Sequence, residues 1–137
     1  MKENVLGRIA ALLLMVIVAA LTVAVATGCG AKEKPSDTVE KFYILLSERK
    51  FNEAYGLLAY EGKTKILMDE EYFVSNAEKQ TPQGRTLTAF SVISETEDGD
   101  NARVRFSATF QEPDKEPQTN EVETRLVKVD GKWKIIY

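Results

Sequence analysis

Apolar residues recur with two different periods along the chain, and the change of period separates a helical part from a strand part. From residue 37 to about residue 80 they recur every three or four positions, which is the spacing of one helix face. The apolar faces of three predicted helices are Val39, Phe42, Tyr43 and Leu46; Phe51, Ala54, Tyr55 and Leu58; and Tyr72, Phe73 and Ala77. Asp37 and Glu40 have the spacing of a capping box, so the first helix is predicted to begin at Asp37.

After Pro82 and Gly84 the period becomes two, which is typical of strands with one buried face. Strands are predicted over 86–95, 104–110 and 122–129, and Asp130-Gly131 predicts a tight hairpin into a fourth strand. Across that hairpin, three pairs are expected on the side covered by helices: Lys128 with Trp133, Leu126 with Ile135, and Thr124 with Tyr137. Helices followed by four antiparallel strands predict an α+β domain.

The first 28 residues differ from this pattern and are expected to be a signal peptide or a membrane anchor. Residues 9–26 are apolar apart from Thr22, and Lys2 and Arg8 precede them. Such a stretch fits the core of a signal peptide, and it is also long enough to span a bilayer. Cleavage after the small residues 24–26 followed by free secretion is a third interpretation. In all three cases the domain is exported, because positive charge before the segment stays in the cytoplasm.

Cys29 is the only cysteine in the chain, and it lies three residues after the end of this apolar segment. The residues Ala26-Thr27-Gly28-Cys29 resemble the lipobox of bacterial lipoproteins, although the first lipobox position is usually Leu and here is Ala26. The resemblance implies a lipid on Cys29, a flexible tether over 29–36, and a domain over 37–137 on the extracytoplasmic face of the cell membrane. The other expected attachment is the uncleaved 9–26 helix.

Three stretches of the domain resemble a known family: "DTVEKFYILLSERKFNEAYGLL", "DGDNARVRF" and "VKVDGKWKIIY". They are similar to the small lumazine-binding-like domains of unknown function (DUF4878 type) on bacterial lipoproteins, in the nuclear-transport-factor-like, or cystatin-like, superfamily. The resemblance implies two to three helices on a curved four-stranded antiparallel sheet that enclose a conical cavity. Ligand-binding residues of that cavity would be Phe106, Thr124, Trp133 and Tyr137, and packing in the core is the alternative.

Acid–base chemistry has few candidates in this chain. Some members of that superfamily are isomerase-like or dehydratase-like enzymes, which need an acid or base inside the cone. The chain contains no histidine, and all six aspartates fall at predicted caps or turns. Glu95 is the only carboxylate whose strand position is compatible with pointing inward, but the favoured interpretation is that it is exposed at the strand end beside the turn. The phenols of Tyr43, Tyr55, Tyr72 and Tyr137 could point into the cavity or leave their rings in the core.

Charge excludes one class of partner. The net charge is -3, and residues 1–28 carry a net +1, so the remainder carries -4. Such a domain lacks the clustered cations that nucleic acid requires. Arg103, Arg105 and Arg125 form a basic strip on the outer sheet face opposite Glu123, where cross-strand charge pairs are expected. No cofactor or metal site is predicted.

The sequence therefore predicts a non-catalytic binding module for a small apolar ligand or an envelope protein. An isomerase or dehydratase that uses Glu95 and a tyrosine is one alternative. A structural accessory of an envelope complex is the other.

Overall fold

A computed structural model describes residues 32–60 and 69–137 of the chain, and residues 33–137 form one compact unit. The apolar segment 9–26 and Cys29, on which the predicted anchor depends, lie outside the described residues. Among the residues that are described, none of the helices is both long and apolar enough to cross a membrane.

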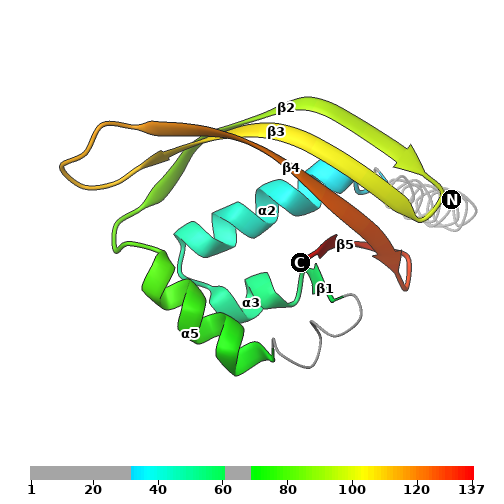
Figure 1. Ribbon diagram of the computed structural model, residues 1–137, viewed down its shortest axis with the longest axis horizontal. Coiled ribbons are helices and arrows are strands. Elements are labelled where there is room, and N and C mark those ends of the chain that lie inside the picture. The colour runs from blue at the N-terminus through cyan, green and yellow to red at the C-terminus, as the bar shows by residue number, and fades with distance from the viewer. Residues whose placement is uncertain (1–31, 61–68) are drawn as a thin grey trace, which may run out of the picture. The chain divides into compact units, whose positions relative to one another are not determined.

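The unit has mixed α+β architecture, with three helices against one face of a curved five-stranded sheet (Figure 1). The helices are α2 (Pro35–Ser47), α3 (Phe51–Tyr55) and α5 (Glu70–Gln80), and the strands are β1 (Leu58–Ala59), β2 (Thr86–Asp98), β3 (Asn101–Gln111), β4 (Gln118–Val129) and β5 (Lys132–Ile136). The strand order is β1-β5-β4-β3-β2. The predicted α+β class is confirmed, but the expected all-antiparallel sheet of four strands is wrong, because β1 is a fifth strand and runs parallel to β5.

Strand β1 occupies residues that the sequence pattern assigned to the second helix. Helix α3 ends at Tyr55 with Gly56 as its C-cap, which releases Leu58 from the helix. The backbone N–H of Ile135 donates to Leu57 O at 2.9 Å, and the N–H of Tyr137 donates to Ala59 O at 3.1 Å. These hydrogen bonds pair the edge of β5 that β4 does not cover. With two residues, β1 is too short to show an alternation of apolar and polar residues in the sequence.

Helix α2 begins two residues before the predicted position, and its first turn is closed by side chains. Pro35 occupies the first helical position, where its missing N–H leaves no donor unpaired. Asp37 lies inside the first turn, and its carboxylate accepts a hydrogen bond from the backbone N–H of Lys34 at 2.9 Å. The predicted capping box of Asp37 with Glu40 is therefore wrong: Lys34 is the N-cap residue, and Asp37 is the residue inside the helix that accepts from its N–H.

The core lies between the helices and the concave face of the sheet (Figure 1). The hairpin from β4 to β5 buries the expected side: Leu126, Trp133 and Ile135 are all buried, and Leu126 is paired with Ile135. The predicted pair of Thr124 with Tyr137 does not form. Pairing between β4 and β5 ends at Leu126, and β5 continues alongside β1 instead.

Strand β2 contains two register shifts against β3, one at Thr88 and one at Ile93. Each shift moves the following residues to the opposite face of the strand. Phe90 and Val92 are therefore opposite core residues of β3, although Val92, like Ile93, remains exposed. The second shift reverses the first, so Glu95 lies opposite the buried Val104 and on the helix-facing side, whereas the sequence favoured a solvent-exposed position at the strand end.

Candidate functional site

A cleft of about 440 Å³ lies where α2, α5 and the C-terminal residue meet. Helix α5 packs against α3 more than against the sheet, which leaves room between α5 and α2. The lining residues come from α2, from α5 and the turn after it, and from the end of the chain: Phe42, Tyr43, Leu46, Tyr72, Phe73, Asn76, Ala77, Gln80, Thr81, Arg85 and Tyr137.

Aromatic rings form the walls of this cleft and connect it to the core. Phe73 lies 6.4 Å from Phe42 and 6.1 Å from Tyr137, measured between ring centroids. Tyr43 continues this series toward the sheet, with its ring 5.4 Å from that of Phe106. These distances are typical of packed aromatic pairs, which hold the rings in fixed positions. The walls can therefore contact the faces or edges of a planar apolar molecule.

Arg85 is the only charged side chain among the described residues that line the cleft. It follows the turn after α5, in which its backbone N–H donates to Pro82 O at 3.2 Å. The guanidinium carbon lies 4.1 Å from the centroid of the Phe110 ring, a cation–π arrangement. Its Nε is buried and has no hydrogen-bond partner in the part of the chain that the structure describes. A buried N–H without a partner is costly, so an acceptor that reached Nε after a small rotation of the Arg85 side chain would be stabilised.

The hydroxyl of Tyr43 stays protonated at neutral pH. Burial of the side chain raises the pKa of Tyr43 above its ordinary value of 10.0, Arg85 opposes this by attracting the phenolate, and Tyr137 adds to the increase. Electrostatic coupling to both residues is consistent with their shared place in the cleft. A protonated phenol beside a guanidinium provides a second donor for an anionic group.

Glu95 is engaged at the N-terminus of α2 and does not line the cleft. Its Oε2 accepts a hydrogen bond from the backbone N–H of Ser36 at 2.7 Å. That N–H is one of the donors that a helix leaves unpaired in its first turn, and a carboxylate there also interacts favourably with the helix dipole. Glu95 is half-buried, so it is neither the solvent-exposed residue nor the cleft base considered from the sequence.

The four residues predicted to bind a ligand lie in different surroundings. Tyr137 lines the cleft and is 53% exposed. Phe106 and Trp133 are buried in the core, and Thr124 is half-buried opposite Val104. Sequence reasoning missed Arg85, and the available signal was a lone cation directly after the Pro82 and Gly84 turn.

No cluster of potential metal ligands is found among the described residues. Residues 32–60 and 69–137 contain no group of three or more histidine, cysteine or carboxylate side chains that could hold a metal ion.

Comparisons with known proteins place the fold. No protein-family model matches the chain, and the search of curated proteins gives no significant match. Among solved structures, a SEC-C motif-containing protein from Rhodopseudomonas palustris is similar, with a TM-score of 0.58 and 16% identity over 76% of each chain. An NTF2-like transpeptidase from Campylobacter jejuni has a TM-score of 0.56 and 15% identity over 77% of this chain and 99% of its own. These similarities show an NTF2-like fold, which includes both enzymes and non-enzymes.

Proposed function

We propose that this chain is a membrane-anchored, extracytoplasmic binding protein whose NTF2-like domain holds a small planar anion in the α2–α5 cleft. The observation that carries the proposal is the unpartnered, buried Nε of Arg85 beside the aromatic walls. Ligand pockets are commonly apolar with a small number of fixed polar groups that orient the ligand. This cleft has that composition.

The chemistry of the lining favours a particular ligand class. The rings of Phe42, Phe73 and Tyr137 suit a flat, apolar body. Arg85 can donate to a carboxylate, sulfonate or phosphate through its planar guanidinium. None of the side chains that line the cleft is acidic, so no side chain there competes with a ligand anion for Arg85. The amides of Asn76 and Gln80 can accept or donate to further polar groups of the ligand.

The same lining supports binding over acid–base catalysis. The described side chains around the cleft include no carboxylate, imidazole or thiol that could act as a general base at neutral pH. Glu95, the residue that an isomerase or dehydratase mechanism would require, is hydrogen-bonded to Ser36. The presence of a cleft also favours a ligand over a purely structural role as an envelope accessory.

The membrane part of the proposal is supported by the sequence. Lys2 and Arg8 precede the apolar residues 9–26, and the lipobox-like residues end at Cys29. We place the chain with the small lumazine-binding-like domains (DUF4878 type) of bacterial lipoproteins. The domain would then face away from the cytoplasm, attached through a lipid on Cys29 or through the uncleaved 9–26 helix.

Two probe molecules that differ in charge test the ligand class. 2-Naphthoate and its neutral isostere 2-naphthamide would be titrated into the isotope-labelled full-length chain in detergent micelles, with backbone amide shifts as the readout. We expect naphthoate to bind with saturating shifts on α2 and α5, and naphthamide to bind more weakly. Arg85→Gln should weaken naphthoate binding by about 10–100-fold and remove the preference for the anion, because a hydrogen bond to a charged group is lost.

A matched control variant tells whether the loss of affinity comes from removing Arg85 itself or from removing any one positive charge. Arg105→Gln removes the same charge from the outer face, where Arg105 pairs with Glu121, and should leave naphthoate affinity unchanged. Equal losses in both variants would contradict the proposal. So would saturating shifts that lie away from α2 and α5, or equal affinities for naphthoate and naphthamide in the unmodified chain.

A further inference from the structure

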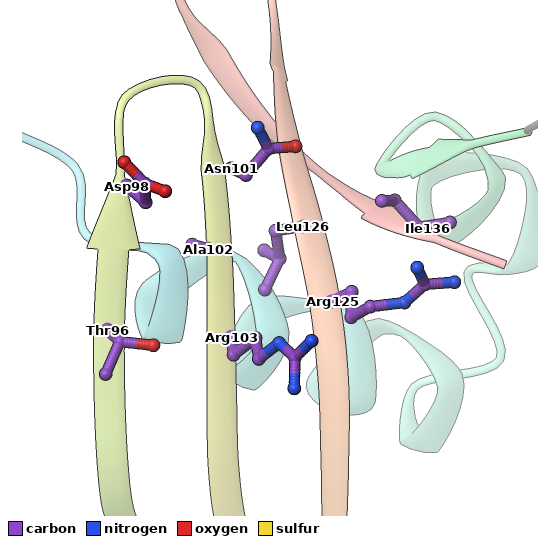
Figure 2. Close-up of a pocket in the computed structure, with 8 residues that line it drawn as sticks. All are labelled: Thr96, Asp98, Asn101, Ala102, Arg103, Arg125, Leu126 and Ile136. Carbon is purple, nitrogen blue, oxygen red and sulfur yellow. The ribbon is translucent and has the colours of Figure 1, made fainter.

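A second pocket, of about 360 Å³, lies on the face of the sheet opposite to the helices (Figure 2). It is bounded by the ends of β2, β3, β4 and β5, and its lining residues are Thr96, Asp98, Asn101, Ala102, Arg103, Arg125, Leu126 and Ile136. Figure 2 shows the side chains of Arg103 and Arg125 extending in the same direction, toward Ile136 on β5. The pocket is separate from the α2–α5 cleft, and the two share no lining residue.

Arg103 and Arg125 are direct cross-strand neighbours in the register of β3 and β4. Like charges at such opposed positions repel one another and destabilise a sheet. A second cation opposite Arg103 is therefore not explained by strand pairing. An anion between the two guanidinium groups would remove this repulsion.

The charge pairs along β3 and β4 leave Arg125 without an ionic partner among the described residues at this end of the sheet. Arg105 is opposite Glu123 in the register, but it forms its ion pair with Glu121 at 2.9 Å. Glu123 instead lies 3.8 Å from Arg103, beyond hydrogen-bond distance. The expected cross-strand charge pairs are thus present and shifted along the strands. Arg125 has no ion-pair or hydrogen-bond partner among the residues that the structure describes.

We propose that Arg103 and Arg125 form an anion site on the outer face of the sheet, which takes the phosphate or carboxylate group of a small molecule or of a lipid headgroup. Two guanidinium groups can each donate paired hydrogen bonds to the oxygens of one such group. The amide of Asn101 and the hydroxyl of Thr96 add polar contacts at the same pocket.

Asp98 narrows the class of ligand further. It lies at the end of β2, paired with Asn101 across the turn, and its carboxylate lines the pocket. A second negative charge on the ligand would be repelled there, whereas a hydroxyl or ammonium group would be accepted as a donor. The ligand therefore has one anionic group and a remainder that carries a hydroxyl or ammonium donor for Asp98, which includes phosphoethanolamine and glycerophosphate headgroups but not phosphocholine.

The test uses the isotope-labelled full-length chain, with the side-chain Nε–H signals of the arginines and the Asn101 amide as readouts. Inorganic phosphate would be titrated into the chain in uncharged detergent micelles at pH 6, where most of it is the monoanion. In parallel, the chain would be placed in nanodiscs of phosphatidylcholine with and without phosphatidylglycerol. We expect Arg125→Gln to weaken phosphate binding by about tenfold, because charge-assisted hydrogen bonds are lost. Arg105→Gln, which removes the same charge from the same face, should change it less than twofold.

The outcomes separate the two sources of the anion. Saturable shifts with inorganic phosphate support the site with a free phosphate compound as its ligand. Shifts of the same signals that appear only with phosphatidylglycerol support the site with a lipid headgroup as its ligand. The proposal is overturned if neither probe shifts these signals, or if Arg105→Gln weakens binding as much as Arg125→Gln does. The fold of each variant would be checked by its remaining amide spectrum.

Discussion

Replacing Glu95 tests whether this residue stabilises the start of helix α2 or takes part in ligand binding or catalysis. The Glu95 carboxylate accepts from the Ser36 N–H at 2.7 Å, so Glu95→Ala removes one charge-assisted hydrogen bond and one favourable interaction with the helix dipole. The loss of a helix cap costs about 0.5–2 kcal/mol, and because Glu95 is half-buried we expect about 1–2 kcal/mol for Glu95→Ala. Glu95→Gln keeps an acceptor oxygen and loses only the charge, so about 0.5–1 kcal/mol is expected.

Thermal and denaturant unfolding of the full-length chain, followed by circular dichroism, measures these changes. For a domain of this size, each 1 kcal/mol lowers Tm by about 4–8 °C. Glu116→Gln is the matched control, because it removes the same charge from the exposed β3–β4 loop. Naphthoate affinity should be the same in all three variants. The reasoning is refuted if Glu95→Ala unfolds like the unmodified chain, or if it stays folded but loses ligand binding or turnover.

Other variants test the core, the turn before Arg85 and the buried phenols. Phe106→Ala should lower the free energy of unfolding by about 3–5 kcal/mol in denaturant titrations, because the side chain is fully buried. A loss below about 1 kcal/mol would contradict its place in the core. Gly84 and Gly131 both have φ +76°, but only at Gly84 would an added Cβ clash with a neighbour, Pro113 Cγ at 2.7 Å. Gly84→Ala should therefore lower Tm more than Gly131→Ala. Equal losses of Tm would contradict this. Burial, with lesser contributions from neighbouring tyrosines, raises the pKa of Tyr60 above its ordinary 10.0, so the stability that its protonated phenol contributes is present below pH 10 and is lost as pH rises further. Tyr60→Phe should therefore reduce the slope of the free energy of unfolding against pH above pH 10. An unchanged slope would contradict this assignment.

Regular elements with long apolar periods were predictable, because their pattern is local. The faces of α2 and of the β4–β5 hairpin follow from the spacing of residues such as Val39, Leu126 and Trp133, all of which are buried. Features that depend on distant contacts were not predictable. Strand β1 has two residues and forms only because β5 offers an unpaired edge, and the register shifts at Thr88 and Ile93 have no sequence signal of their own.

The candidate site depended even more on tertiary contacts. The sequence identified Tyr137 and Tyr43 as aromatic residues of interest. It could not show that a cleft lies between helices α2 and α5. Arg85 follows a turn and resembles any solvent-exposed cation in the sequence. Its importance comes from the Phe110 ring beneath it and the burial of its Nε, which are contacts between residues far apart in the chain.

The most direct test of the central claim is a native mass spectrum of the full-length chain, extracted gently from the cells that produce it, beside the Arg85→Gln variant. The account predicts a non-covalent adduct of a small acidic compound on the unmodified chain and its loss from Arg85→Gln. The same spectrum gives the mass of the N-terminal end, which reports whether the chain begins at a lipid-modified Cys29. A bare protein in both samples, or an adduct that Arg85→Gln retains, would contradict the proposed cleft ligand.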